Sequence, residues 1–480
     1  MARMFITAVC LTIFTLGFAQ QKKTANRLKV TVQDEIQRNQ NTYRDIAMQI
    51  WNLAEVGYKE ERSSTLLKET LKANGFHIDS GVAGIPTAFV ATYGSGSPAI
   101  GILAEYDALP GMAQQAVPEK KAAEGSNAGH ACGHHLFGTA SAAAAIALKK
   151  LMEAGKVNGT IKLFGCPAEE GGSGKVYMVR AGLFDGIDAV IHWHPGDRNE
   201  VTLTSALANM SAKFRFYGKA AHASSSPEKG RSALDAVESM NFMANLMREH
   251  IPQESRIHYV ITRGGTAPNV VPDFAEVYYY VRHPDKEVVK SLFARIEEAA
   301  KGAALGTGTT TDREIIGGTH DLLINHALAS AAQANLEQVG GVSYTTEEIE
   351  FARTLQHTLP SAPGLETAGV IIPFDAPRNA GIASTDVGDV SYAVPTVGIR
   401  TATWVPGTPA HSWQAVACGG TSLGVKGMVV AAKAMAMTAI DLFTDPALIR
   451  DARTEFVEAS GSYQYEALLG NRSPALNYRE

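Results

Sequence analysis

The sequence predicts an α/β protein in two parts: a domain with a largely parallel central sheet and helices on both faces, and an α+β sandwich inserted within it. Apolar, strand-like runs alternate with helix-like stretches on both sides of the insertion, which favours a parallel sheet. Inside the insertion, half-exposed strand patterns pair with amphipathic helices. The length of 480 residues exceeds what one ordinary core holds, which also favours two domains.

The N-terminus has the pattern of a secretory signal peptide over residues 1–19. After Arg3, an apolar stretch over residues 5–18 ends among small residues, and a polar run follows. We therefore expect an exported protein, periplasmic or extracellular. The alternative is an N-terminal anchor helix. No other run is expected to be apolar and long enough to cross a bilayer, so no membrane span remains after cleavage.

The first part of the main domain, residues 20–204, carries most of the predicted sheet. Helices are expected over residues 41–54 and 65–73. Strands are expected over residues 87–92, 99–104, 160–166 and 189–192. Polar clusters follow three of these strands, at residues 105–107, 169–170 and 192–194. Because ligand sites of open parallel sheets lie beyond the carboxyl ends of the strands, we expect the site there.

The inserted domain is expected at residues 205–317. Its predicted strands cover residues 210–217, 258–262 and 276–281, and its helices cover residues 232–247 and 286–303. The main domain then resumes over residues 318–480. It is expected to contain a helix over residues 320–339, a strand over residues 394–399 and a long helix over residues 424–443.

The composition excludes two classes of protein. Hydrophobic residues make up 45% of the chain, too many for a largely disordered protein. The formal net charge of −5 is small and no run is rich in Lys and Arg, so no nucleic-acid partner is expected. Signal cleavage leaves three cysteines, Cys132, Cys166 and Cys418, which form no complete disulfide framework. Cys132 is therefore available as a ligand.

A stretch over residues 129–135 predicts a metal site. It places His130, Cys132, His134 and His135 within seven positions. Imidazole and thiolate are ligands that a borderline-soft divalent metal prefers. The spacing fits neither a c-type haem site, which needs Cys-x-x-Cys-His, nor a closed structural zinc site, which needs a second Cys pair. The alternative, four unrelated structural side chains, explains this crowding less well.

Two further groups are candidates for chemistry. Glu169 and Glu170 are adjacent carboxylates that repel each other, so the pair needs a nearby cation or plain solvent. Beside a metal, one Glu binds the ion and its neighbour takes a proton from the attacking water. His192 and His194 share one face of a predicted strand, so either one can reach a common metal.

A series of segments in fixed order carries a family resemblance. They are AEYDALP (residues 104–110), GHACGHHLFG (129–138), CPAEEG (166–171), WHP (193–195), GKAAHA (218–223), PNVV (268–271), ASTDVGDVS (383–391) and GTPAHSWQ (407–414). Across residues 43–443 the chain resembles the metal-dependent amidohydrolase and metallopeptidase superfamily of glutamate carboxypeptidases, aminoacylases and indole-acetyl-amino-acid hydrolases. Within it, the chain is most similar to the branch that hydrolyses p-aminobenzoyl-glutamate.

The resemblance implies two divalent metal ions, zinc or manganese, with Cys132 as the bridging ligand. The further ligands that it implies are His134, Glu170, His411 and one of His192 and His194. The p-aminobenzoyl-glutamate branch favours His194. One tetrahedral zinc cannot use five ligands, but two ions that share a bridge can. Glu169 would be the general base and acid.

One position departs from the family pattern. His135 stands where relatives commonly have Asp or Asn, so an acidic partner that orients a ligand histidine is missing, unless Asp107 supplies it.

The resemblance also implies that the inserted domain is a lid and a dimerisation domain. His222 would reach a neighbouring subunit's site and stabilise the oxyanion. Asn269 and Arg282 would hold the substrate, with Arg282 as a fork for a carboxylate; a surface ion pair is the alternative for Arg282. A homodimer is expected. A pair of different subunits is the alternative, because the branch includes an enzyme of two subunits.

The implied function is metal-dependent hydrolysis of an amide bond between an acyl or aroyl group and an amino acid, on a small-molecule substrate similar to p-aminobenzoyl-glutamate. One alternative is a broader N-acyl-amino-acid amidohydrolase or dipeptidase on the same scaffold. Another is a non-catalytic exported protein that binds an amino-acid conjugate or a metal. This last alternative predicts a broken ligand set, whereas every expected position is filled in this sequence.

Overall fold

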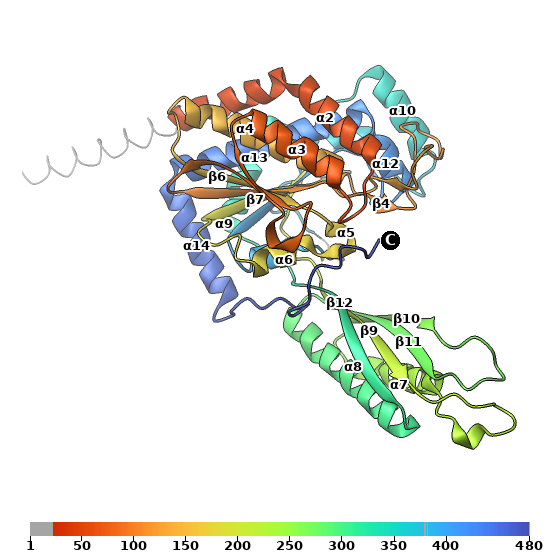
Figure 1. Cartoon of the computed structure of the whole chain (residues 1–480). Helices are drawn as coiled ribbons and strands as arrows, with labels where there is room; N and C mark the ends of the chain where they lie inside the picture. The colour runs from red at the N-terminus through yellow and green to blue at the C-terminus, as the bar shows by residue number, and fades with distance from the viewer. Residues whose placement is uncertain (1–22, 379–380, 382, 480) are drawn as a thin grey trace, which may run out of the picture.

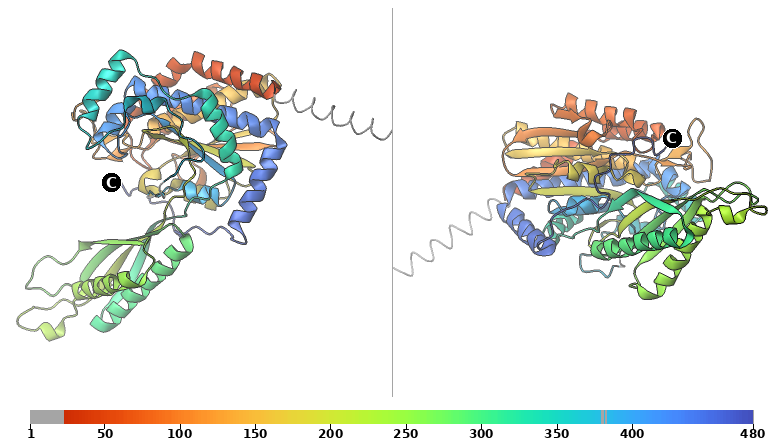
Figure 2. Two further views of the ribbon diagram at one scale, coloured as in Figure 1. Left: turned by 180° about the vertical axis from the view of Figure 1, so that it is seen from behind. Right: turned by 60° about the horizontal axis from the view of Figure 1, so that its bottom comes forward.

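The computed structural model describes residues 23–378, 381 and 383–479, so the predicted signal peptide lies outside the described residues. It shows a large α/β domain and a smaller α+β domain (Figure 1). The smaller domain extends away from the larger one, as the view from behind in Figure 2 also shows.

The large domain is built on a seven-stranded sheet. In spatial order its strands are β1 (His77–Ser80), β2 (Phe89–Ser95), β6 (Gly159–Cys166), β3 (Ala99–Glu105), β7 (Ala189–Gly196), β13 (Thr396–Ala402) and β8 (Glu200–Val201). The four neighbours from β6 to β13 are parallel, and the three outer strands are antiparallel. The α/β class is therefore confirmed, with a mixed sheet whose centre is parallel. Side chains such as Ile102, Leu163 and Ile191 are fully buried, which explains the continuous apolar runs of the central strands.

Four helices cover one face of this sheet. They are α2 (Gln40–Leu53), α3 (Glu61–Ala73), α4 (His134–Glu153) and α13 (Ser422–Thr444) (Figure 1). Helix α4 carries many alanines, which let it approach the sheet closely. At Gly138 the approach is tightest, because a Cβ there would lie 2.6 Å from the carbonyl oxygen of Glu105. This contact fixes the start of α4 beside the end of β3.

Helix α13 corrects one expectation from the sequence. By length and composition it is long and apolar enough to cross a membrane, with a mean hydropathy of 1.5. However, 89% of this apolar window is buried inside the protein. The helix forms part of the hydrophobic core, where apolar residues on all sides of a helix are expected.

The remaining elements of the large domain are short or peripheral. They are β4 (Leu109–Pro110), β5 (Ala128–Gly129), α5 (Glu169–Gly172), α6 (Gly174–Arg180), α9 (His326–Val339), α10 (Thr346–Gln356), α11 (Val387–Ser391), α12 (Trp413–Gly419) and α14 (Pro446–Ser460). The helix predicted over residues 320–339 begins later, at His326. Its N-cap is Asn325, whose side chain accepts a hydrogen bond from the Leu328 N–H at 3.0 Å.

The small domain has its own antiparallel sheet and its own core. The strand order is β10 (Arg256–Arg263), β11 (Phe274–His283), β9 (Ala208–Tyr217) and β12 (Thr310–Thr319). Helices α7 (Ala233–Met247) and α8 (Lys286–Thr307) pack on this sheet. Strand β12 is absent from the predicted elements, because its first half is polar and largely exposed. Strand β12 ends at Thr319, so the sheet of the small domain extends two residues beyond the predicted end of the insertion.

Candidate active site

The loop before α4 turns Cys132 and His134 toward one point. Gly133 between them has a φ of 79°, in the left-handed region that favours glycine. A Cβ at this position would also lie 2.7 Å from the Pro195 side chain. The turn brings Cys132 Sγ to 3.4 Å from His194 Nε2, at the end of β7. Glycine therefore permits the convergence that the sequence predicts.

Two groups of possible ligand atoms meet at Cys132. The first group is Cys132, His134 and His194, and the second is Cys132, Glu170 and His411. Within each group the ligand atoms lie within 4.8 Å of one another. His411 reaches the site because its loop is tied to the cluster, through a hydrogen bond from its N–H to the Ala131 carbonyl at 3.0 Å. The structure thus brings together five of the six proposed metal ligands around a shared thiol.

The unused polar atoms at this point fit divalent metal ions. His134 Nε2 and Glu170 Oε1 are buried and make no hydrogen bond of acceptable geometry among the described residues, although His134 Nε2 lies 3.0 Å from Glu105 Oε2. Glu170 Oε1 lies 3.0 Å from His411 Nε2. Two ligand atoms each about 2.1 Å from one metal stand about 3.0 to 3.4 Å apart, so these short contacts have the dimensions of a coordination shell. Soft thiolate and imidazole donors with one carboxylate suit a zinc-like ion.

Asp107 orients both sides of this cluster. Its Oδ1 lies 2.8 Å from His134 Nδ1, which leaves Nε2 to face Cys132 and His194. Its Oδ2 accepts a hydrogen bond from the Glu170 N–H at 2.9 Å. Asp107 therefore supplies the acidic partner that His135 does not provide.

His130 and His135 have structural partners instead. His135 Nε2 lies 3.0 Å from the Gly419 carbonyl, and His130 Nε2 lies 3.1 Å from the Ile50 carbonyl. Their rings pack together with centroids 4.8 Å apart. Burial lowers the pKa of both side chains, and for His130 the value falls to about 4. Both histidines are therefore neutral packing residues beside the cluster.

The structure places His194, and not His192, in the cluster. His192 belongs to neither group of ligand atoms among the described residues. Its ring packs against β13, where a Cβ on Gly398 would lie 2.5 Å from Nε2. Burial lowers the pKa of His192 to about 3. Of the two alternatives, the geometry favours His194, because His192 belongs to no ligand group among the described residues and its ring packs against Gly398.

Glu169 lies on the other side of His134. It forms a group with Glu105 and His134, with atoms within 4.8 Å of one another, and Glu105 Oε2 lies 3.0 Å from His134 Nε2. Desolvation, with the negative charges of Glu170 and Glu105, raises the pKa of Glu169 well above its usual value. Burial and the charge of Glu170 likewise raise the pKa of the Cys132 thiol. Nearby cations would offset both effects, as expected for a thiolate ligand and a carboxylate base.

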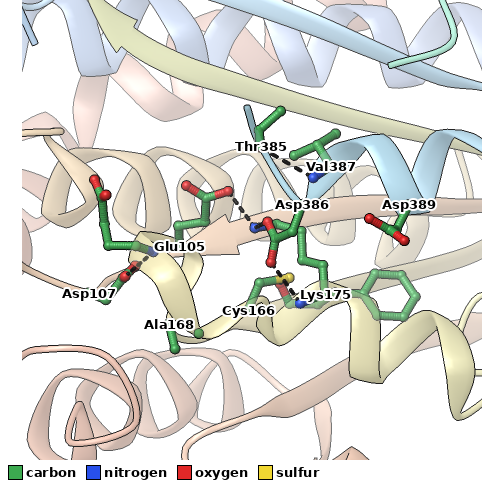
Figure 3. Close-up of polar contacts among 12 residues, drawn as sticks. Glu105, Asp107, Cys166, Ala168, Lys175, Thr385, Asp386, Val387 and Asp389 are labelled. Carbon is green, nitrogen blue, oxygen red and sulfur yellow. Dashed lines mark hydrogen bonds and ion pairs between the residues drawn. The ribbon is translucent and has the colours of Figure 1, made fainter. Parts of the chain in front are cut away.

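A buried charge network, which the sequence pattern does not predict, lies behind this group. Lys175 Nζ lies 2.6 Å from Glu105 Oε1 and 2.7 Å from Asp386 Oδ1, and all three side chains are buried (Figure 3). Asp386 Oδ2 also accepts a hydrogen bond from the Lys175 N–H at 2.9 Å. A Lys in the first turn of a short helix gives no sequence signal for such burial. Only the two acidic residues, at the end of a strand and before a short helix, could have suggested it.

The catalytic and substrate-binding residues expected in the small domain belong to none of the ligand groups among the described residues. His222 and Asn269 are neighbours, because the Ala223 N–H bonds to the Asn269 carbonyl at 3.0 Å and His222 pairs with Val270. Arg282 stands near the other end of β11, stacked on Tyr280 at 5.1 Å. From Phe274 to Arg282 the strand spans about 27 Å. One chain therefore does not bring Asn269 and Arg282 together at one substrate.

Comparisons with known proteins agree with this architecture. A family model described as the peptidase dimerisation domain matches residues 207–307. The chain is 41% identical to one subunit of the p-aminobenzoyl-glutamate hydrolase of Escherichia coli (strain K12), over 90% of this chain and 96% of that protein. It is 32% identical to the Xaa-Arg dipeptidase of Mus musculus, over 85% of this chain and 87% of that protein. A solved dinuclear metal-binding peptidase of the M20 family from Bacillus subtilis shares the fold, with a TM-score of 0.59. The two sequences are 16% identical, and the alignment covers 85% of this chain and 99% of that one.

Proposed function

Because the chain belongs to the M20 family of metal-dependent peptidases and amidohydrolases, we propose that it hydrolyses the amide bond between an aromatic acyl group and an amino acid. Hydrolysis of an amide is the reaction class of the family. The finer assignment, a substrate similar to p-aminobenzoyl-glutamate, is supported by the 41% identity to a subunit of an enzyme named for that substrate.

One observation carries the proposal: two groups of ligand atoms share Cys132, and Glu169 stands beside them. Cys132, His134 and His194 would hold one ion, and Cys132, Glu170 and His411 would hold the other, so that both ions would share the Cys132 thiolate. Divalent ions held there would make a water more acidic and polarise the scissile carbonyl. Elemental analysis of the purified protein distinguishes zinc from manganese.

In the proposed mechanism, Glu169 moves the proton. It accepts a proton from the attacking water and returns it to the leaving amine as the tetrahedral intermediate collapses. Asp107 holds His134 and the Glu170 backbone in place while this happens. His222 donates a hydrogen bond to the oxyanion, and Asn269 holds the substrate beside it.

We propose that His222 and Asn269 act on the site of a partner chain in a dimer. The peptidase dimerisation match over residues 207–307 supports this assembly. A homodimer is the first expectation. The other named subunit of the Escherichia coli hydrolase is 30% identical over 55% of this chain, which makes a pair of different subunits the alternative. We also propose, from the N-terminal sequence, that the protein is exported.

The test is a substrate panel on the purified protein, with metal analysis and native mass measurement of the same sample. We expect about two ions per chain, a dimer, and the highest kcat/KM on p-aminobenzoyl-glutamate. Dipeptides that end in arginine test the second candidate, which the similarity to Xaa-Arg dipeptidase favours. Metal binding without hydrolysis of any amide in the panel would refute the proposal and support a binding protein.

A further inference from the structure

Arg400 lies beside the metal-facing histidine on the central sheet. Strands β7 and β13 are parallel, and their register pairs Arg400 with His194. Neighbouring strands are about 4.8 Å apart, so paired residues stand close together. Gly196 gives Arg400 its space, because a Cβ there would lie 2.5 Å from Arg400 Cδ. The register therefore places Arg400 beside a residue of the proposed metal centre, with its side chain over Gly196.

A cavity of about 300 Å³ opens at this point. Its lining includes His194, Asp197, Arg198, Arg400, Trp404 and Ala410. His194 belongs to one ligand group, and Ala410 precedes His411 of the other group. The cavity thus adjoins both groups and is placed to receive the part of a substrate next to the scissile bond.

Two hydrogen-bond donors in this lining, on Arg400 and Trp404, make no hydrogen bond among the described residues, although Arg400 forms a long ion pair with Glu200. The nearest carboxylate to Arg400 is Glu200, at 3.9 Å, which is beyond hydrogen-bond distance. Trp404 Nε1 is buried and has no partner among the described residues. Arg198, unlike Arg400, already has a carboxylate acceptor, because its Nε donates a hydrogen bond to Asp197 Oδ1 at 3.0 Å. Unpaired donors around a cavity favour an anionic, oxygen-bearing ligand group.

We propose that Arg400 binds a carboxylate of the amino-acid part of the substrate, and that it thereby selects N-acyl amino acids with a free carboxylate near the scissile bond. A guanidinium offers a carboxylate two parallel N–H donors. A carboxylate one residue from the scissile carbonyl is at most about 3.6 Å further along the chain, so an arginine that lines the cavity beside His194 is placed to meet it. The assignment rests on the proposed function and moves the carboxylate site from Arg282 in the small domain to the main sheet.

The experiment compares Arg400→Gln with Arg198→Gln on p-aminobenzoyl-glutamate and on its diamide. The two variants remove the same charge from the same cavity, at side chains of similar exposure, 41% and 51%. For Arg400→Gln we expect a KM for the acid raised about tenfold to hundredfold, with kcat within about twofold and the diamide unaffected. For Arg198→Gln we expect little change on either substrate. Arg400→Lys, which keeps the charge without the fork, should restore part of the affinity.

Equal effects of the two variants, or an unchanged preference for the acid over the diamide in Arg400→Gln, would overturn the assignment. A second measurement does not depend on turnover: calorimetric binding of glutamate to the metal-loaded protein. We expect binding by the wild type and by Arg198→Gln, and its loss in Arg400→Gln with the metal content and thermal midpoint retained. Glutamate binding that Arg400→Gln keeps would refute the role of Arg400. Absence of hydrolysis by the wild type refutes the proposed function instead, and leaves this binding test intact.

Discussion

At the scale of single residues, the site depends on one thiol that two ligand groups share. Cys132 Sγ can serve both groups only because Gly133 lets the chain turn sharply before α4. If the two ions share the Cys132 thiolate, removal of this thiol takes one ligand from each ion. This sharing distinguishes Cys132 from the other two buried cysteines, neither of which belongs to a ligand group among the described residues.

We therefore expect Cys132→Ala to weaken the binding of both ions and to abolish hydrolysis. Metal content after dialysis against a weak chelator measures this. Cys166→Ala is the matched control, because Cys166 is also buried, its thiol donates to the Phe164 carbonyl, and it belongs to no ligand group among the described residues. If Cys132→Ala retained two ions with unchanged affinity, the bridging assignment would be wrong.

Glu169→Gln tests the proton-transfer role without changing the size of the side chain. General acid–base catalysis contributes about 10²- to 10⁴-fold, so kcat should fall by about that factor. Metal content should stay the same, because Glu169 is outside both groups that contain Cys132. The check is kcat and elemental analysis on one preparation; a variant that loses its metal, yet keeps full activity in the loaded fraction, contradicts the role.

At the scale of elements, the buried network of Lys175 joins three segments that carry the site. Glu105 ends β3, Lys175 lies in α6, and Asp386 precedes α11. When an ion pair is buried, the free energy lost by removing both charges from water offsets much of their mutual attraction. Such a network is therefore weak evidence that the charges stabilise the fold. It does, however, leave two buried carboxylates without a cation if the lysine is removed.

Lys175→Met should therefore destabilise the folded protein by about 3–5 kcal/mol. The urea midpoint of the metal-loaded protein measures this change. Lys29→Met is the matched control: it breaks the pair with Asp441, whose side chains keep 11% and 22% exposure and can regain water. Equal losses for the two variants would show that the burial of the network has no special cost.

Glu60 gives an element-scale pH prediction. It lies at the start of α3, where its carboxylate accepts hydrogen bonds from the Ala168 N–H at 2.8 Å and from Thr87 at 3.0 Å. Burial and the charge of Asp107 raise the pKa of Glu60 to about 8 from 4.5. The native state thus binds more protons than the unfolded state between these values, so stability should fall as pH rises from about 4.5 to 8.

Glu60→Gln imitates the protonated carboxyl and should make the thermal midpoint less dependent on pH across that window. Thermal unfolding of the wild type and the variant at pH values from about 5 to 9 is the measurement. Glu61→Gln, on the exposed first turn of the same helix, removes the same charge and serves as the control. If Glu60→Gln left the pH dependence of the thermal midpoint unchanged, the raised pKa of Glu60 would be contradicted.

At the scale of the whole molecule, the small domain extends away from the large one (Figure 2), and its His222 belongs to no ligand group among the described residues. The dimerisation-domain match over residues 207–307 supports the proposal that this domain meets a partner chain. If His222 acts on the partner's site, a complete site combines residues of two chains.

Mixing two inactive variants tests this arrangement. His222→Ala and Glu169→Gln should each have very low activity alone. After they are unfolded and refolded together, a mixed dimer contains one site with both residues intact, so about a quarter of wild-type activity should return. If the mixture stays as inactive as its components, the site is completed within one chain.

The sequence by itself determined the features that depend on residues close together in the chain, which are the fold class and the presence of a metal site. The alternation of apolar runs predicted the α/β class, and the close spacing of Cys132 and His134 indicated a metal site, because period and spacing are local properties. The polar clusters after β3, β6 and β7 also located the site, since parallel strands bring their carboxyl ends to one edge.

Only the tertiary structure decided what depends on residues far apart in the chain. His192 and His194 lie on the same strand face, and packing against Gly398 of β13 is what separates them. The burial of Lys175 and the position of Arg400 beside His194 likewise follow from contacts between distant segments. Such contacts are set by how elements pack, and packing is a property of the whole fold that no local pattern encodes.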